Sequence, residues 1–200
     1  MTPKSMKDYL ASLSELMLST EVTDGQGSTL SLDQGAETAV QMILKVGDAA
    51  GKVMLAGNGG SSAVVSHVQN DLCNAVGVRG LVFTEQPLLT ALANDNGYGS
   101  VYEHPIHLWG EPGDLLLTVS SSGNSENIIR AIQAAQDKGC QVITFSGFDS
   151  DNRSRQMGDL NFYVASGVYG FVETAHAALT HYLTDRASSV RSPGSATRAC

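Results

Sequence analysis

Few cysteines and the lack of any long apolar run set the first limits on this 200-residue chain. Its three cysteines, Cys73, Cys140 and Cys200, are widely spaced and form no CxxC pair, so neither a zinc ribbon nor a disulfide framework is indicated. Free thiols fit a reducing compartment, and we expect a cytoplasmic protein. No apolar run approaches the roughly 18 residues of a membrane span, and the N-terminal segment lacks a signal-peptide core.

Basic residues are also scarce. The chain has 12 Lys and Arg against 20 Asp and Glu, which gives a formal net charge of −8. Proteins that bind nucleic acid usually carry a basic patch or stripe, so we expect no nucleic-acid partner. The shortage does not exclude an anionic small molecule, because backbone amides and helix N-termini can hold a phosphate without Lys or Arg.

The N-terminal part of the chain predicts helices. Five apolar residues recur at helical spacing between residues 9 and 17, which is typical of an amphipathic helix. Residues 23–31 are polar and glycine-rich and predict a connector. An apolar stripe in residues 32–50 predicts a second helix. We expect residues 1–31 to precede the main domain.

Beyond residue 50, strand-like and helix-like segments alternate. Short apolar runs predict strands at residues 52–56, 80–84, 114–120, 141–146 and 160–164. Helices are predicted at residues 61–76, 87–93, 124–138 and 172–185. Alternation of this kind implies an α/β fold, a parallel sheet with helices on both faces. The main domain is expected at residues 32–187, and the Ser, Pro, Gly and Arg content of residues 188–200 predicts a disordered tail.

Two polar loops each follow a predicted strand and precede a predicted helix. They read GNGGSS at residues 57–62 and SSSGNS at residues 120–125. Ligands of parallel sheets bind beyond the carboxyl ends of strands, where glycines expose backbone amides and serines add donors. Helix capping explains either loop alone equally well, but four serines in six residues exceed what capping requires. Neither loop matches a dinucleotide fingerprint or a P-loop, and phosphate is the ligand that fits best.

Titratable side chains on two predicted helices give a second signal. His67 and Asp71 are four residues apart and share one helix face, where they could bind a metal or act as an acid–base pair. Glu173 and His176 share a face of the last helix. Glu173 and His181 lie about 12 Å apart along a straight helix, so a common site needs a bent helix or another subunit.

Each of these residues also has an ordinary structural explanation. His176 and His181 could be polar edges of a packed helix, and a surface hydrogen bond could join His67 to Asp71. His104 and His107 flank a proline and predict a loop without function. The combination favours function, because a phosphate-type loop is followed directly by a helix that carries imidazole and carboxylate groups.

These segments together resemble the SIS (sugar isomerase) domain, and most closely the phosphoheptose isomerase family. The resemblance rests on GNGGS at 57–61, His67, AND at 93–95, GD at 113–114 and SSSGNS at 120–125. It extends from about residue 32 to residue 185. It implies a three-layer α/β/α, flavodoxin-like fold with a five-stranded parallel sheet and extra N-terminal helices. It also implies a homotetramer with active sites between subunits.

The resemblance carries roles over to particular positions. It implies that the substrate, a sugar phosphate, is bound by Asn58, Gly59, Gly60, Ser61, Asn94, Asp95, Ser120, Ser121, Ser122, Ser125 and Glu173. It implies a Zn²⁺ cofactor bound by His67, Asp71, Glu173 and His181. Asp71 stands where the family has a glutamate, Glu173 where it has a glutamine, and Ala75 where it usually has a basic residue.

The implied reaction is an aldose–ketose isomerisation through an enediol(ate), from sedoheptulose 7-phosphate to D-glycero-D-manno-heptose 7-phosphate. Asp71 and His181 are the expected acid and base, in either order, and the metal would polarise the carbonyl. The alternatives are an isomerase for another sugar phosphate, a sugar-phosphate sensor, or a non-catalytic SIS module that binds a protein such as a replication initiator. The retained His67, Asp71 and His181 favour the enzyme.

Overall fold

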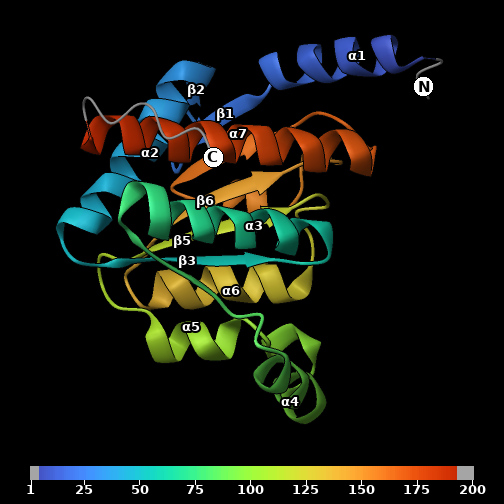
Figure 1. Ribbon diagram of the computed structural model, residues 1–200. Helices are drawn as coiled ribbons and strands as arrows, with labels where there is room; N and C mark the ends of the chain where they lie inside the picture. Colours follow the sequence, from blue (N-terminus) through green and yellow to red (C-terminus); the bar gives the residue numbers. More distant parts are fainter. Residues whose placement is uncertain (1–4, 193–200) are drawn as a thin grey trace.

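The computed structural model describes residues 5–192 and shows three layers, with helices on both faces of a central sheet (Figure 1). The strands are β1 (Glu21–Asp24), β2 (Thr29–Leu30), β3 (Lys52–Gly57), β4 (Arg79–Val82), β5 (Leu115–Ser120), β6 (Gln141–Ser146) and β7 (Leu160–Tyr163). The helices are α1 (Met6–Leu18), α2 (Leu32–Asp48), α3 (Gly60–Asp71), α4 (Gln86–Asn96), α5 (Glu103–Trp109), α6 (Glu126–Asp137) and α7 (Tyr169–Arg191). A π-helical turn, Leu72–Val76, continues α3, and short 3₁₀ turns lie at Tyr98–Ser100 and Ser154–Gln156.

The five predicted parallel strands are confirmed, but the sheet is larger than predicted. Its order is β2-β1-β7-β6-β5-β3-β4, and the parallel part runs from β7 to β4. Numbered along the chain, the five parallel strands lie in the order 2-1-3-4-5, which is the flavodoxin-like arrangement. This arrangement has one switch point, between β3 and β5, where the chain reverses the direction in which it adds strands.

The prediction of a connector at residues 23–31 is wrong, because this segment belongs to a β-hairpin. β1 pairs antiparallel with β7 and with β2, so the sheet gains two strands at one edge. The Asp24 carboxylate accepts hydrogen bonds from the amides of Gln26 and Ser28, at 2.9 and 2.8 Å, and this side chain fixes the turn. Val22 is fully buried on the inner face, which anchors the hairpin to the core.

Side chains of the central strands alternate between two apolar cores. Val53 and Leu55 of β3 pack in one core with α2, α3 and α7, whereas Met54 and Ala56 pack in the other with α5 and α6. Both faces of the strand are therefore covered, as in other parallel sheets (Figure 1). Within the described residues, no helix is long and apolar enough to cross a membrane.

Two other expectations are corrected at helices. The last helix continues to Arg191, so residues 188–191 do not belong to a disordered tail. The Arg191 guanidinium explains the extension, since it donates to the carbonyls of Val76 and Gly77 and pairs with Asp48 at 2.7 Å. The rest of the expected tail, residues 193–200, lies outside the described residues. His104 and His107 lie on α5 rather than in a loop.

Candidate active site

The two polar loops meet at the switch point of the sheet. β3 and β5 are parallel neighbours with Gly57 opposite Val119, so the loops that follow them leave the sheet side by side. They enclose a cavity of about 340 Å³. The lining residues are Asn58, Gly59, Gly60, Ser61, Ser120, Ser121, Ser122, Ser125, Tyr169 and Glu173. Eight of these ten residues come from the two predicted loops, so the loops converge on one cavity.

The serine loop is held in a shape that suits an anion. The amide of Gly123 donates to the carbonyl and hydroxyl oxygens of Ser120, at 3.1 and 3.2 Å, and α6 begins three residues later. Gly123 has a φ of 63°, and a Cβ there would overlap Oδ1 of Asn152. Among the described residues, the buried Ser121 hydroxyl has no hydrogen-bond partner. Free hydroxyls beside a helix N-terminus are suited to an anionic oxygen.

The glycine loop is fixed by an amide pair that the sequence did not reveal. Asn58 and Asn127 exchange two side-chain hydrogen bonds of 2.9 and 2.8 Å, and the Tyr98 hydroxyl donates to Asn58 Oδ1 at 3.1 Å. This pair ties the loop after β3 to the start of α6. Asn127 and Tyr98 stand in no motif, so only the folded structure identifies them. The Asn58 side chain is bonded within this network, and Asn58 also lines the cavity.

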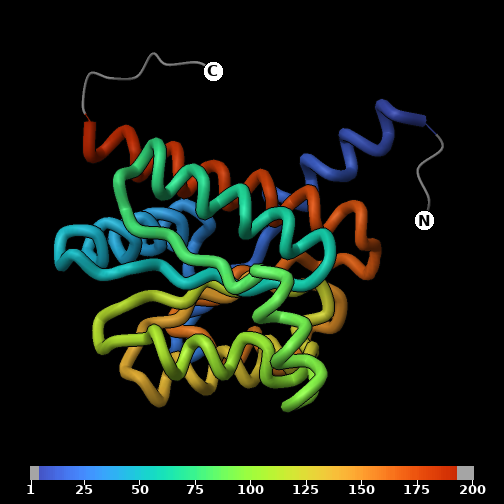
Figure 2. Tube along the Cα trace, turned by 60° about the horizontal axis from the view of Figure 1, so that its bottom comes forward, coloured from blue at the N-terminus to red at the C-terminus, as the bar shows by residue number. Residues whose placement is uncertain are grey.

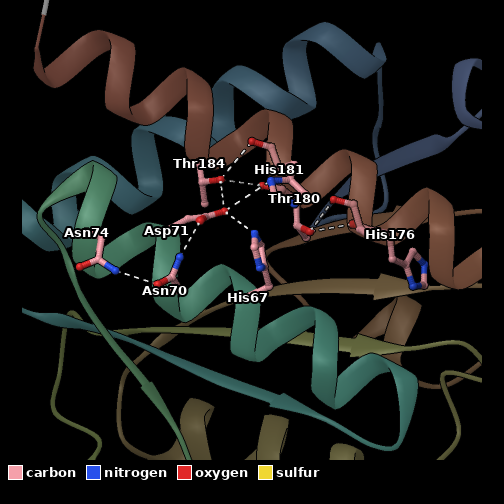
Figure 3. Close-up of polar contacts among 9 residues, drawn as sticks. His67, Asn70, Asp71, Asn74, His176, Thr180, His181 and Thr184 are labelled. Atoms are coloured by element: carbon pink, nitrogen blue, oxygen red, sulfur yellow. Dashed lines mark hydrogen bonds and ion pairs between the residues drawn. The ribbon is translucent and has the colours of Figure 1, made fainter. Parts of the chain in front are cut away.

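A second cluster of polar side chains lies between α3 and α7, two helices that run side by side (Figures 1 and 2). Its members are His67, Asp71 and His181. Asp71 Oδ2 lies 3.5 Å from Nε2 of His67 and 3.4 Å from Nδ1 of His181 (Figure 3). One ligand atom from each residue lies within 4.8 Å of the others. Two imidazoles and one carboxylate are a ligand set that zinc accepts, with a coordination position left for substrate or water. These three residues fit the expected metal.

Neighbouring side chains orient the carboxylate of Asp71. The Thr184 hydroxyl lies 3.3 Å from Asp71 Oδ2, and the Asn70 amide donates to Oδ1 at 3.2 Å (Figure 3). Thr184 is buried, whereas about half of each imidazole ring is exposed. The group is therefore supported from inside and open to solvent, as a reactive or metal-binding site requires.

Glu173, the fourth expected ligand, lies elsewhere. Its carboxylate lines the serine cavity, and a Cβ on Gly60 would come within 2.6 Å of both carboxylate oxygens. None of the three residues His67, Asp71 and His181 lines the cavity. Gly60 and His67 are seven positions apart on α3, about 10 Å at 1.5 Å per residue.

Three further candidates also lie apart from the cavity. Asn94 and Asp95 are exposed on α4, where the Asn94 amide donates to Asp95 at 2.7 Å. His176 is fully buried, with Nε2 3.1 Å from the Ser146 carbonyl oxygen. Burial lowers the pKa of His176 to about 4, so the ring is neutral and structural.

Comparison with known proteins agrees with this architecture. The SIS domain family matches residues 13–147, more than half of the chain. The structure of the phosphoheptose isomerase GmhA from Neisseria gonorrhoeae aligns with a TM-score of 0.79 and 25% identity, over 90% of this chain and 96% of that one. These matches define the class, a SIS-domain protein with its cavity at the switch point.

Sequence relatives show to which family of SIS-domain proteins the chain belongs. The phosphoheptose isomerase of Chromohalobacter salexigens is 32% identical over 157 residues, 74% of this chain and 80% of the relative. That of Thiobacillus denitrificans is 31% identical over 80% of this chain and 83% of the relative. The chain belongs to the phosphoheptose isomerase family, which makes it an isomerase of the aldose–ketose class.

Proposed function

We propose that the protein interconverts sedoheptulose 7-phosphate and D-glycero-D-manno-heptose 7-phosphate through an enediol(ate). The observation that carries this proposal is the serine-lined cavity at the switch point of the sheet. The name shared by the sequence relatives supports the choice of a heptose phosphate.

The phosphate end of the substrate is assigned to the loop at residues 120–125. Among the described residues that line the cavity none is Lys, Arg or His, so the donors that this chain offers to the phosphate are neutral: serine hydroxyls, loop amides and the N-terminus of α6. Ser122 and Ser125 are partly exposed, and the Ser121 hydroxyl is free to donate. A cavity of about 340 Å³ falls within the range of small-molecule sites.

Proton transfer at carbon is assigned to Asp71 and His181. One of the two acts as the base and removes the proton from the carbon beside the carbonyl, and the other acts as the acid and protonates the carbonyl oxygen. His67, Asp71 and His181 would hold Zn²⁺, and the bound ion would supply Lewis-acid polarisation of the carbonyl. The Thr184 hydroxyl orients the Asp71 carboxylate, both as a metal ligand and as an acid or base.

The separation of this group from the cavity of its own chain has a structural consequence. We propose that the chains assemble, as a homotetramer, so that Asp71 and His181 of one chain face the serine cavity of another. A monomeric protein would then bind phosphate but turn over no substrate.

Two sets of variants test the assignment. Asp71→Asn and His181→Gln are expected to abolish isomerisation while phosphate still binds, because neither residue lines the cavity. Ser122→Ala is expected to weaken phosphate binding about tenfold or more, the effect of losing one hydrogen bond to a charged group. Full turnover in either of the first two variants would disprove the roles of Asp71 and His181.

A further inference from the structure

The helix that carries His67 and Asp71 changes its winding directly after Asp71. Leu72–Val76 form a π-helical turn, in which the Gly77 amide donates to the Leu72 carbonyl five residues earlier. Such turns are rare, and they frequently lie at functional sites. A π-helical turn contains more residues than an α-helical one, so it changes where the chain and the side chains beside it point. The contacts of this turn therefore bear on the position of Asp71.

One polar face of α7 holds the carbonyl end of the π-turn. The Ser188 hydroxyl donates to the Ala75 carbonyl at 3.1 Å, and Nη1 of Arg191 donates to the carbonyls of residues 76 and 77 at 3.3 and 3.1 Å. The last carbonyls of a helix lack partners within it, and a cation beside them also meets the negative end of the helix dipole. Arg191 is itself fixed, because its Nη2 pairs with Asp48 of α2 at 2.7 Å.

Hydrogen-bonded side chains connect the π-turn to Asp71. The amide of Asn74, in the turn, donates to Asn70 Oδ1 at 2.7 Å, and the Asn70 amide donates to Asp71 Oδ1 at 3.2 Å (Figure 3). The other carboxylate oxygen, Oδ2, accepts from Thr184, which lies four residues before Ser188 on the same face of α7. Both oxygens of Asp71 are therefore oriented by groups whose positions depend on how the π-turn packs against α7.

The position of Asp71 matters because its side chain is short. An aspartate has one methylene group fewer than a glutamate, so the backbone must bring its carboxylate close to both imidazoles. Its Oδ2 lies 3.5 Å from Nε2 of His67 and 3.4 Å from Nδ1 of His181. His67 shares α3 with Asp71, whereas His181 belongs to α7, so the second distance depends on how the two helices pack. Groups of a binding site need to be held within about 0.5 Å of their working positions.

We propose that Arg191 is a positioning residue for the cluster of His67, Asp71 and His181, and that it acts through the π-turn. Arg191 holds the carbonyl end of the turn on α7, and the turn holds Asp71 beside His181, so that the two side chains can bind one ion. Loss of the guanidinium releases the turn and with it the Asp71 carboxylate. The serine cavity stays as it is, because none of residues 70–77 lines it. This inference rests on the metal site of the proposed function.

Metal binding measured beside phosphate binding tests this role. Competition with a chelator measures Zn²⁺ affinity, the absorption spectrum of bound Co²⁺ reports ligand geometry, and calorimetry measures the binding of inorganic phosphate. For Arg191→Met we expect Zn²⁺ affinity to fall about tenfold or more, the usual effect of losing support behind a ligand. The Co²⁺ spectrum should change, and phosphate affinity should not. Arg191→Lys should recover part of the Zn²⁺ affinity, because an ammonium group can still donate to a carbonyl.

Arg186→Met is the matched control, since Arg186 lies on the same helix but pairs with Glu37 of α2 at 3.6 Å. It should change neither Zn²⁺ nor phosphate binding. Unchanged Zn²⁺ affinity in Arg191→Met, or an equal loss in both variants, overturns the inference and leaves the proposed isomerisation standing. If Arg191→Met does not fold, Ser188→Ala decides: a loss of about threefold in Zn²⁺ affinity is expected, and no loss overturns the role.

The native protein separates this inference from the proposed function. Native protein that binds neither Zn²⁺ nor Co²⁺ overturns the inference, even if it converts sedoheptulose 7-phosphate. Native protein that binds Zn²⁺ but converts no sedoheptulose 7-phosphate contradicts the proposed function, whereas the predicted loss of Zn²⁺ affinity in Arg191→Met would still support the role of Arg191.

Discussion

Replacement of Gly123 by alanine tests whether the serine loop owes its shape to this glycine. Gly123 has a φ of 63°, a conformation that costs an alanine about 1 kcal/mol. Its Cβ would also overlap Oδ1 of Asn152, which accepts hydrogen bonds from the Ser154 hydroxyl and the Arg155 amide, both at 3.1 Å. Moving Asn152 away breaks these two bonds, at about 1 kcal/mol each. The free energy of unfolding should fall by about 3 kcal/mol in all.

Gly27→Ala is the matched control for this prediction. Gly27 has a φ of 80°, but nothing lies within 4 Å of the position of its Cβ, so only the backbone strain of about 1 kcal/mol applies. Urea denaturation of both variants measures the difference, and calorimetry with inorganic phosphate measures the effect on the cavity. We expect Gly123→Ala alone to lose phosphate affinity. Equal destabilisation of the two variants would refute the contact with Asn152 as the cause.

Two more predictions concern buried polar side chains. Thr184→Val should weaken Zn²⁺ binding about tenfold in a chelator competition, because Asp71 loses the hydroxyl that orients it, whereas Thr184→Ser should bind normally. The pKa of His176 is lowered by burial to about 4, below its ordinary 6.5, so its contribution to stability is present above pH 6.5 and is lost as the pH falls toward 4. In the native protein the free energy of unfolding should drop by about 2 kcal/mol between pH 7.5 and 5. The drop should be smaller in His176→Gln, which lacks the buried imidazole. Parallel pH profiles of stability for the two proteins would contradict this prediction.

The sequence predicted those parts of the fold that follow from local pattern. Apolar runs identified the five parallel strands, because strands covered on both faces are apolar throughout. The carboxyl ends of parallel strands share one edge, so the convergence of the loops after β3 and β5 was also predictable. The hairpin of β1 and β2 was not, since its short strands are polar and its turn depends on the Asp24 side chain.

The sequence predicted those contacts of the candidate site that depend on local spacing, but not those made between distant segments. Helical spacing placed His67 beside Asp71, but His181 joins them only because α7 packs along α3, a contact over more than 100 residues of sequence. The spacing along α7 puts about 12 Å between Glu173 and His181, and in the structure the Glu173 carboxylate lines the serine cavity while His181 lies beside Asp71. No local signal marked Thr184 or Asn152, whose importance comes from the atoms that surround them in the folded chain.

The most direct test of the central claim is NMR of the purified protein with sedoheptulose 7-phosphate, with and without added Zn²⁺. We predict that anomeric signals of D-glycero-D-manno-heptose 7-phosphate appear, and that they appear faster with Zn²⁺. Substrate line-broadening without conversion would contradict the assignment of this heptose and point to another sugar phosphate. The absence of both conversion and binding would contradict the account of the cavity as a sugar-phosphate site.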